Sequence, residues 1–311
     1  MGLLRGAVRG LVLLVGLATL IGLLDRVSWV FELADVFRLQ YVVVLVGAAL
    51  VALVLRLSWL AGVAAAFALV NVAVLGIPLL PTAAADGHAA GSLRLVVANV
   101  QVGNTDFAAV ARLVAQTHPD VFGVTELTPA MARHLAGELP KYHSRILEPR
   151  GDAYGIGVFS RVPLRSARVV PFPADGGPPT IVAHVGVAGR LVTLVVTHVH
   201  TPFAGSIHIR HLRALAAARP SFGRRVVVCG DFNTPPWSGP LRDFSSHARL
   251  RDLYGGRAWS GYSWPTWSSL LRVPLDNCFV SSSVVVTAHG DGPDIGSDHR
   301  PLVVDLSVTK Q

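Results

Sequence analysis

Residues Val226–Ser238 read "VVVCGDFNTPPWS", an apolar run that breaks into Gly-Asp-Phe-Asn and then into two prolines. The apolar run predicts a buried strand, and Pro235 and Pro236 end its pairing. Residues two apart on a strand point to the same side, so we expect Asp231 and Asn233 to face one bound atom together. A turn would give a similar pattern, so the rest of the chain has to distinguish a site from a turn.

Two upstream apolar runs also end in polar residues. "LRLVVANV" places Leu93, Leu95 and Val97 on one face and ends that stripe at Asn99, and "DVFGVTEL" ends at Glu126. The amphipathic segment 105–117 between them predicts a helix capped by Thr105 or Asp106. A strand, a helix and a strand in succession form a unit that packs the helix on one face of a sheet.

Downstream of residue 154 the pattern changes to short strands separated by Gly and Pro, with "VAGR" as a hairpin turn. "SIHIRHLRALAAAR" predicts a helix that covers the sheet. The fold class expected from these elements is α/β.

The composition divides the chain into two unlike parts. Apolar residues make up 51% of the chain, which is too many for one ordinary soluble domain, and the excess lies before residue 80. We therefore expect a membrane anchor over residues 1–80, a linker over 81–91 and a globular domain over 92–311.

The anchor contains three apolar stretches that approach or exceed the roughly 20 residues needed to cross a bilayer. They predict about three transmembrane helices, although the first two stretches are short unless flanking residues join them. A signal peptide is the alternative for the first stretch, because two arginines precede it and "GLATLIG" within it offers small residues. The stretches are Gly10–Leu24, Tyr41–Leu55 and Leu57–Leu80.

The arginines near the ends of these stretches predict the orientation. Arg5, Arg9 and Arg56 would lie on the cytoplasmic side, whereas the loop over residues 25–40 balances its charges. Three crossings then leave the globular domain on the extracytoplasmic side of a multi-pass protein of the cytoplasmic membrane.

The net charge of +8 lies almost wholly in the globular domain. A basic surface favours an anionic partner such as phosphate, nucleic acid or lipid headgroups without choosing among them. Cys229 and Cys278 each lie in an apolar run, which favours two small buried thiols, with a disulfide outside the cell as the alternative. The sequence contains no CxxC motif or His/Cys zinc pattern.

Polar residues at the ends of strands suit one kind of chemistry when they are taken together, although each one alone has an ordinary structural explanation. A hard divalent ion, Mg²⁺ or alternatively Mn²⁺, binds carboxylate and carboxamide oxygens. The residues expected to bind it are Glu126, Asn99 and Asp298.

Hydrolysis of a phosphate ester by water also requires a base and hydrogen-bond donors. Asp231 is the candidate base, and Asn233 would orient the attacking water. His198 and His299 would donate to the phosphate, and Asp276 would hold His299 in its protonated form.

The motifs "VANVQ", "PDVFGVTEL", "YGIGVFSR", "VVTHVH", "GDFNTPP", "LDNCFVS" and "GSDHRPLVVDL" occur in an order and spacing that resemble the endonuclease/exonuclease/phosphatase superfamily. The resemblance covers about residues 92–308. It implies a four-layered α/β sandwich, in which helices flank two packed mixed β-sheets and the site lies at one edge. It also implies the roles given above for the metal-binding and catalytic residues.

The resemblance has two departures. Gln101 stands where several nucleases have an acidic residue, and the arginine and carboxylate that deoxyribonuclease uses beside its groove have no convincing match. Both departures weaken a nuclease interpretation. We place the substrate-binding residues at Gln101, His200, Trp264 and Trp267.

The anchor resembles that of bacterial membrane members of the superfamily, including the VanJ type linked to teicoplanin resistance. The expected function is hydrolysis of a lipid-linked phosphate or diphosphate of the undecaprenyl diphosphate class, with membrane lipid as the partner and no obligate protein partner. Trp259, Tyr262, Trp264 and Trp267 would cover lipid or simply pack their loop. A membrane-tethered nuclease and a sphingomyelinase-like phosphodiesterase are the alternatives, and nucleic acid is the less favoured substrate.

Overall fold

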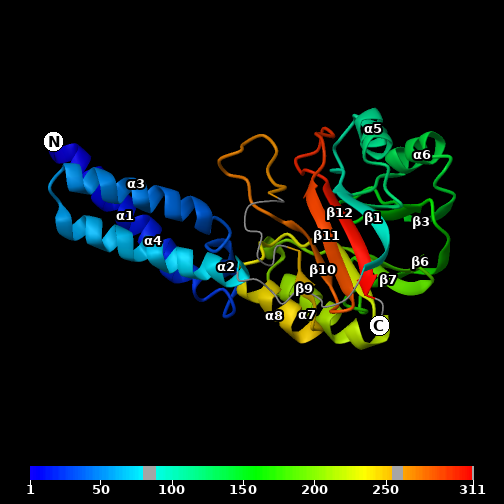
Figure 1. Cartoon of the computed structure of the whole chain (residues 1–311). Helices are drawn as coiled ribbons and strands as arrows, with labels where there is room; N and C mark the ends of the chain where they lie inside the picture. The colour runs from blue at the N-terminus through cyan, green and yellow to red at the C-terminus, as the bar shows by residue number, and fades with distance from the viewer. Residues whose placement is uncertain (80–88, 254–261, 310–311) are drawn as a thin grey trace.

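The computed structural model describes residues 1–79, 89–253 and 262–309. Most of the expected linker, residues 81–88, and Trp259 lie outside the described residues, and the last three linker residues already belong to a strand. Figure 1 shows an elongated helical bundle, which contains the N-terminus, beside a rounded α/β domain, which contains the C-terminus.

The described part of the α/β domain contains two mixed, six-stranded sheets. Strands β1 and β2 are parallel, as are β7 and β8, and the other paired strands are antiparallel. In spatial order, the first sheet comprises β11 (Val284–Asp291), β12 (Leu302–Thr309), β1 (Ala89–Asn99), β2 (Val121–Thr125), β4 (Ile156–Ser160) and β3 (Ser144–Glu148). The second comprises β5 (Leu164–Pro171), β6 (Pro179–Val187), β7 (Arg190–His198), β8 (Val226–Asp231), β10 (Asp276–Val280) and β9 (Arg251–Asp252).

Helices cover the outer face of each sheet. One apolar core fills the space between the sheets, and two further cores lie under the helix pairs. The first sheet carries α5 (Phe107–Thr117) and α6 (Pro129–Glu138), and the second carries α7 (Ser206–Ala218) and α8 (Gly239–Ala248). Short 3₁₀ turns, η1 (Pro202–Ala204) and η2 (Arg219–Phe222), flank α7. This confirms the four-layered sandwich of two mixed sheets flanked by helices.

Strand pairing brings the polar strand ends together. In the parallel pair β1–β2, Asn99 pairs with Thr125, which directly precedes Glu126. In the second sheet Asp231 pairs with His198 on one side and with Asp276 on the other. Because the two sheets pack face to face, these ends meet at one edge of the sandwich.

Gly230 is required for the close approach of β8 and β7. Its backbone has a φ of 152°, which residues other than glycine rarely adopt. A Cβ at this position would also collide with the carbonyl oxygen of Thr197. Glycine at this position therefore allows the end of β8 to pair closely with β7.

The two cysteines form a disulfide between directly paired residues of β8 and β10, with Cα atoms 4.2 Å apart. The expectation of two free thiols was therefore wrong. The antiparallel register places Cys229 opposite Cys278, which the sequence pattern could not reveal because it does not give the pairing partner of a strand.

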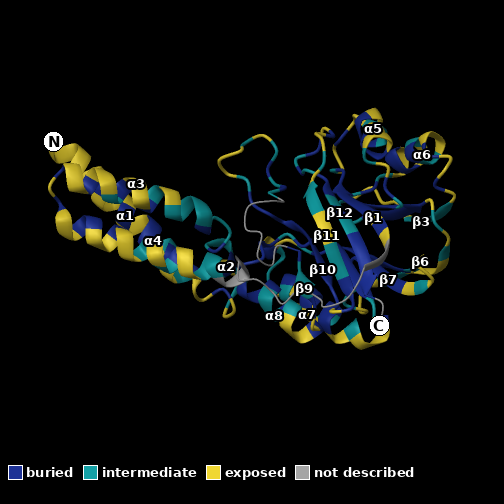
Figure 2. Cartoon of the chain, viewed as in Figure 1, coloured by how far each residue is buried: buried dark blue, intermediate teal, exposed yellow. Residues whose placement is uncertain are grey.

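The N-terminal bundle contains α1 (Gly2–Gly22), α3 (Arg38–Val54) and α4 (Ser58–Leu79), with the short α2 (Trp29–Leu33) between α1 and α3. Two helical segments in the described residues, Gly2–Gly22 and Ser58–Gly76, are long and apolar enough to cross a membrane. The remaining expected crossing, Tyr41–Leu55, corresponds to α3, which has only 17 residues. Figure 2 shows exposed residues along the outer faces of all three long helices.

Candidate active site

The carboxylate of Asp231 is the centre of the polar cluster, and it is only 1% exposed. Its Oδ1 accepts a hydrogen bond from the backbone N–H of Asn233 at 2.8 Å. Its Oδ2 accepts from Asn99 Nδ2 at 3.0 Å and lies 3.5 Å from His198 Nε2 and 3.7 Å from His299 Nε2. Groups from both sheets therefore converge on one carboxylate.

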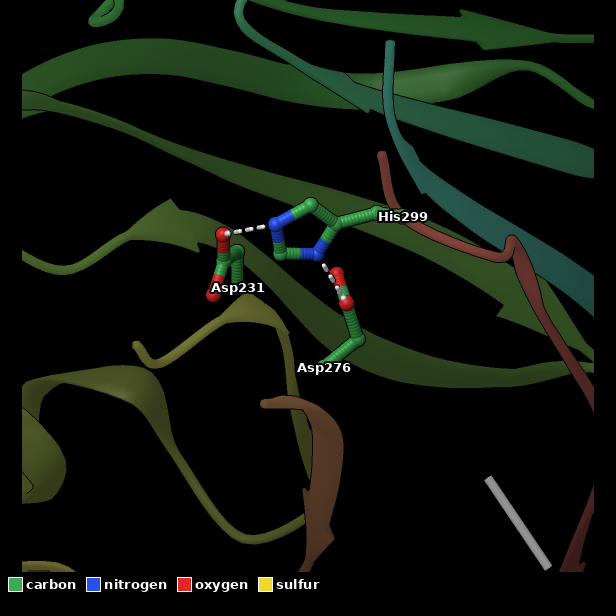
Figure 3. A group of neighbouring side chains, drawn as sticks. All are labelled: Asp231, Asp276 and His299. Carbon is green, nitrogen blue, oxygen red and sulfur yellow. Dashed lines mark hydrogen bonds and ion pairs between the residues drawn. The ribbon is translucent and has the colours of Figure 1, made fainter. Parts of the chain in front are cut away.

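His299 and Asp276 form a buried pair beside this carboxylate, as Figure 3 shows, with 2.7 Å between Nδ1 and Oδ2. Burial alone would lower the pKa of His299, but the charges of Asp276 and Asp231 outweigh burial and raise it to about 10. The pair therefore holds its proton through the neutral range. The predicted partnership of Asp276 with a protonated His299 fits this geometry.

Asn233 is placed by a turn and not by strand alternation, which corrects the reasoning from the sequence. Strand β8 ends at Asp231, and Asn233 has a left-handed φ of 54°, a conformation that Asn tolerates better than most residues. Its Nδ2 donates to the carbonyl oxygen of Val199 at 2.8 Å and lies 3.1 Å from His198 Nε2. The side chains of Asp231 and Asn233 both still lie beside Nε2 of His198, but a turn and not strand alternation brings them there.

His198 has polar contacts at both ring nitrogens. Its Nδ1 lies 2.9 Å from the carbonyl oxygen of Ala153, which can only accept. Its Nε2 lies 3.1 Å from Nδ2 of Asn233 and 3.5 Å from Oδ2 of Asp231. A phosphate that His198 contacts through Nε2 would therefore lie beside Asn233 and Asp231.

Asn99 and Glu126 extend the cluster from the ends of β1 and β2. Asn99 Nδ2 donates to Glu126 Oε1 at 2.9 Å as well as to Asp231, while its Oδ1 accepts from the backbone of Gln101. Glu126 Oε2 accepts from the backbone of Val102 at 2.8 Å. The nitrogen of Asn99, and not the oxygen expected to bind metal, therefore faces the two carboxylates.

Asp298 lies beside the cluster and is held by two neighbours. Its backbone N–H donates to Gln101 Oε1 at 3.2 Å, and its Oδ2 accepts from Trp264 Nε1 at 3.1 Å. The side chain of Gln101 was expected to contact substrate. It instead accepts a hydrogen bond from the loop that contains Asp298.

The donor chemistry of the site suits a hard divalent cation. Glu126 and Asp298 offer carboxylate oxygens whose partners are neutral N–H groups, so both can still bind an ion. Asp231, Asp276 and His299 also have ligand atoms within 4.8 Å of one another. However, His299 and Asp276 already form a hydrogen bond with each other, so we interpret those three as a hydrogen-bonded relay beside the candidate metal ligands Glu126 and Asp298.

The other predicted substrate-binding residues occupy different surroundings. The ring centroids of His200 and Tyr154 are 5.0 Å apart, and burial lowers the pKa of His200. Trp264 lies with its ring centroid 6.5 Å from that of His299, whereas Trp267 is 73% exposed.

Sequence reasoning missed three residues that shape the site. Tyr154 packs against both His198 and His200. Ser297 Oγ donates to the carbonyl of Asn99 at 2.8 Å, and Ser263 Oγ accepts from the backbone N–H of Asp276 at 3.1 Å. Tyr154 begins the quoted motif "YGIGVFSR" and Ser297 lies within "GSDHRP", so their positions beside other candidates were a usable signal.

Solved structures resemble this one in fold at low sequence identity. TDP2 from D. rerio, complexed with a single-strand DNA product, has a TM-score of 0.59 and 20% identity over 69% of this chain and 98% of its own. A family protein from Bacteroides thetaiotaomicron has a TM-score of 0.59 and 20% identity over 70% of this chain and 98% of its own. One from Beutenbergia cavernae DSM 12333 has a TM-score of 0.54 and 19% identity over 70% of this chain and 72% of its own.

None of the curated proteins compared with this chain matches it. The model of the Endonuclease/Exonuclease/phosphatase family matches residues 96–299, which is more than half of the chain and includes every catalytic and metal-binding candidate. Members of this family are hydrolases that act on phosphate esters. The chain therefore belongs to the endonuclease/exonuclease/phosphatase family.

Proposed function

We propose that this protein is a membrane-bound, divalent-metal-dependent phosphoesterase that hydrolyses a lipid-linked phosphate or diphosphate on the outer face of the membrane. The observation that carries the proposal is the convergence of buried phosphoesterase side chains on Asp231, in a chain whose helical bundle exposes apolar faces.

The buried side chains suit attack by water on phosphorus. Asp231 takes the proton of the water, and the turn at Asn233 fixes the orientation of its carboxylate through a backbone N–H. The imidazolium of His299 donates from Nε2, on the side where charge develops on the phosphate oxygens. Asp276 accepts a hydrogen bond from Nδ1 of the same ring and thereby fixes the orientation of the ring.

A divalent ion, Mg²⁺ or Mn²⁺, would be held by Glu126 and Asp298 and would supply positive charge against the phosphate oxygens. Asn99 keeps Glu126 and Asp231 at a fixed separation by donating to both. A single amide thus aligns the metal-binding carboxylate with the base.

The exposed apolar side chains of the bundle favour a membrane location. Only 28% of each of the two candidate spans is buried, whereas the core helix of a soluble domain is mostly buried. Exposed leucines and valines line α3 as well, which supports a third crossing once flanking residues extend it. Leu13, Leu17, Val43, Leu50 and Leu69 each expose more than half of their surface.

The disulfide favours the outer side of the membrane, because disulfides persist in oxidising compartments. The same side follows from Arg5, Arg9 and Arg56 at the opposite end of the helices. Labelling of a cysteine introduced on an exposed loop by a membrane-impermeant maleimide in intact cells tests this side. A residue that reacts only after lysis would reverse the orientation.

A loop that connects the bundle to the active site favours a lipid substrate. Trp264 at its base donates to Asp298, while Trp267 and Leu270 near its tip are 73% and 84% exposed. Gln40, near the start of α3, donates to the carbonyls of Leu270 and Arg272. In Figure 1 this loop (orange) projects from the α/β domain on the side of the bundle. Large apolar side chains in this position suit the interface of a bilayer.

The proposal is tested with full-length protein in detergent, given undecaprenyl diphosphate and, in parallel, plasmid DNA. Asp231→Ala is the blank, and Asp243→Ala, an exposed carboxylate on α8, is the matched control. Metal-dependent phosphate release from the lipid, lost only in Asp231→Ala, is the expected result. An active Asp231→Ala protein would exclude the mechanism.

Nicked plasmid with untouched lipid would instead make the protein a membrane-tethered nuclease. The observation in favour of that alternative is the fold shared with TDP2, which was solved with a single-strand DNA product. The departure at Gln101 weighs against it. A role of the VanJ type in teicoplanin resistance is a narrower proposal, tested by the change in teicoplanin susceptibility when the wild-type and Asp231→Ala proteins are expressed.

A further inference from the structure

The segment over residues 25–40, which connects α1 to α3, buries four of its five charged residues and contacts the α/β domain. Asp25, Glu32, Asp35 and Arg38 are each no more than 3% exposed. Charged residues are almost never this buried unless they are paired. In Figure 1 the segment, including α2, lies between the bundle and the α/β domain, next to α8.

The segment contacts the residues that directly follow Asp231 and Asn233. Trp237 Nε1 donates to the carbonyl oxygen of Asp35 at 2.9 Å, and the backbone N–H of Gly239 donates to Asp25 Oδ2. Arg26 makes an outer ion pair with Asp243 at 3.0 Å, in which both side chains are about half exposed. The connection therefore follows the catalytic turn from residue 234 to the start of α8.

Glu32 makes the innermost of these contacts. It is fully buried, and its Oε1 accepts from Thr234 Oγ1 at 2.7 Å and from Ser238 Oγ at 3.4 Å. Thr234 is also fully buried and directly follows Asn233. A carboxylate from outside the catalytic domain thus fixes the residue next to the one that orients Asp231.

The same oxygen of Glu32 also binds the α7 side of the site. His208 Nε2 lies 3.1 Å from Glu32 Oε1, and His208 Nδ1 faces the carbonyl oxygen of His200. Both ring nitrogens face acceptors, so one buried ring links the carboxylate of Glu32 to the carbonyl oxygen of His200. Glu32 therefore joins the end of β7, through His200, to the turn after β8.

We infer that Glu32 is a positioning residue for the catalytic turn over residues 231–238, acting through Thr234 and His208. The connection between the first two long helices is then a structural part of the active site and not only a tether. This inference rests on the proposed phosphoesterase function for its effect on turnover. Its effect on the turn itself does not depend on the substrate.

The experiment compares Glu32→Gln with two changes at Thr234, in full-length protein in detergent. Glu32→Gln keeps the shape and an acceptor but loses the charge. Thr234→Val removes the hydroxyl at nearly constant volume, and Thr234→Ser keeps it. Arg26→Gln is the matched control, because it removes an exposed ion pair from the same segment without contacting the turn.

Two readouts separate positioning from substrate choice. The first is kcat and KM for bis(p-nitrophenyl) phosphate, a water-soluble ester that needs no lipid access. The second is hydrogen exchange of the backbone amides over residues 232–238. We expect Glu32→Gln and Thr234→Val to lower kcat by about tenfold or more, with KM nearly unchanged, because small misplacements of reacting groups are costly. Amide exchange in the turn should rise in both, and Thr234→Ser and Arg26→Gln should behave like the wild type.

Wild-type kcat and unchanged amide exchange in Glu32→Gln and Thr234→Val would overturn the inference. Equal losses in Thr234→Ser and Thr234→Val would also overturn it, because the hydroxyl would then not be the group that matters. If Glu32→Gln fails to fold, the Thr234 pair still decides. If the wild type hydrolyses no phosphate ester, the proposed function fails, while amide exchange still shows whether Glu32 holds the turn.

Discussion

Replacing Asp276 by Asn tests the hydrogen-bonded pair beside the base. Asp276 is 1% exposed and its Oδ2 lies 2.7 Å from His299 Nδ1. The rise in the pKa of His299 from 6.5 to about 10 corresponds to about 5 kcal/mol in favour of the imidazolium. His299 therefore contributes stability that is complete below pH 6.5 and is lost as the pH rises through about 10. Burial raises the pKa of Asp276, so the burial of that carboxylate contributes in the opposite sense.

Asn keeps an acceptor near His299 but removes the charge, whereas burial continues to lower the pKa of the ring. We therefore expect the alkaline limb of the profile of kcat against pH to move from near 10 into the neutral range. At about pH 8, kcat should fall by about tenfold or more, because only a minor fraction of the rings would still carry the proton.

The assay is kcat for a soluble phosphate ester from about pH 5 to about pH 10, the range that separates the two limbs. Asp243→Asn, the same chemical change on an exposed helix, is the control and should leave the profile unchanged. An alkaline limb that stays in place in Asp276→Asn would show that Asp276 does not set the charge of His299, and the proposed donor role would lose its basis.

Three further predictions concern stability. Replacing Cys229 and Cys278 by Val opens a loop with a sequence separation of 49 residues and should lower the free energy of unfolding by about 4 kcal/mol, measured by urea denaturation of the detergent-solubilised protein; an unchanged midpoint would contradict this. Burial lowers the pKa of His211 to about 3, so the unfolded chain binds a proton below pH 6.5 that the folded chain does not. Stability should fall on acidification by up to about 1.4 kcal/mol per pH unit, and melting curves of His211→Leu should lack part of that slope. Gly230→Ala should prevent stable folding because its Cβ meets a backbone carbonyl, whereas Gly186→Ala, in open space, should express and melt normally.

The sandwich could be predicted from the sequence because its evidence is local. Alternation and apolar runs marked the strands, and Asp106 does cap the helix expected over residues 105–117, whose described bounds are Phe107–Thr117. The hairpin turn "VAGR" also forms as expected, with left-handed backbone at Ala188 and Gly189. Helices α6 and α8 were not predicted, because their apolar faces are short and are partly made of Ala, Met and Phe spaced among polar residues.

The candidate site was predicted less completely, because its geometry depends on contacts between distant segments. The strand ends marked Asp231, Glu126 and Asn99 correctly as neighbours. The sequence could not tell which atom of Asn99 faces the carboxylates, since that depends on the backbone of Gln101. Nor could the sequence reveal that Nδ2 of Asn233 lies within hydrogen-bond distance of Nε2 of His198.

The charged loop over residues 25–40 shows why an anchor and a catalytic domain cannot always be interpreted separately. From the sequence it was a connection with balanced charges, because Asp25, Glu32 and Asp35 stand near Arg26 and Arg38. In the fold its inner charges are buried against a turn about 200 residues away, where Glu32 reaches Thr234. A free tether would leave such charges in water, because burying them is costly unless every partner is in place. The contacts of this loop therefore fix the bundle against the turn that follows Asp231, which a free tether would not do.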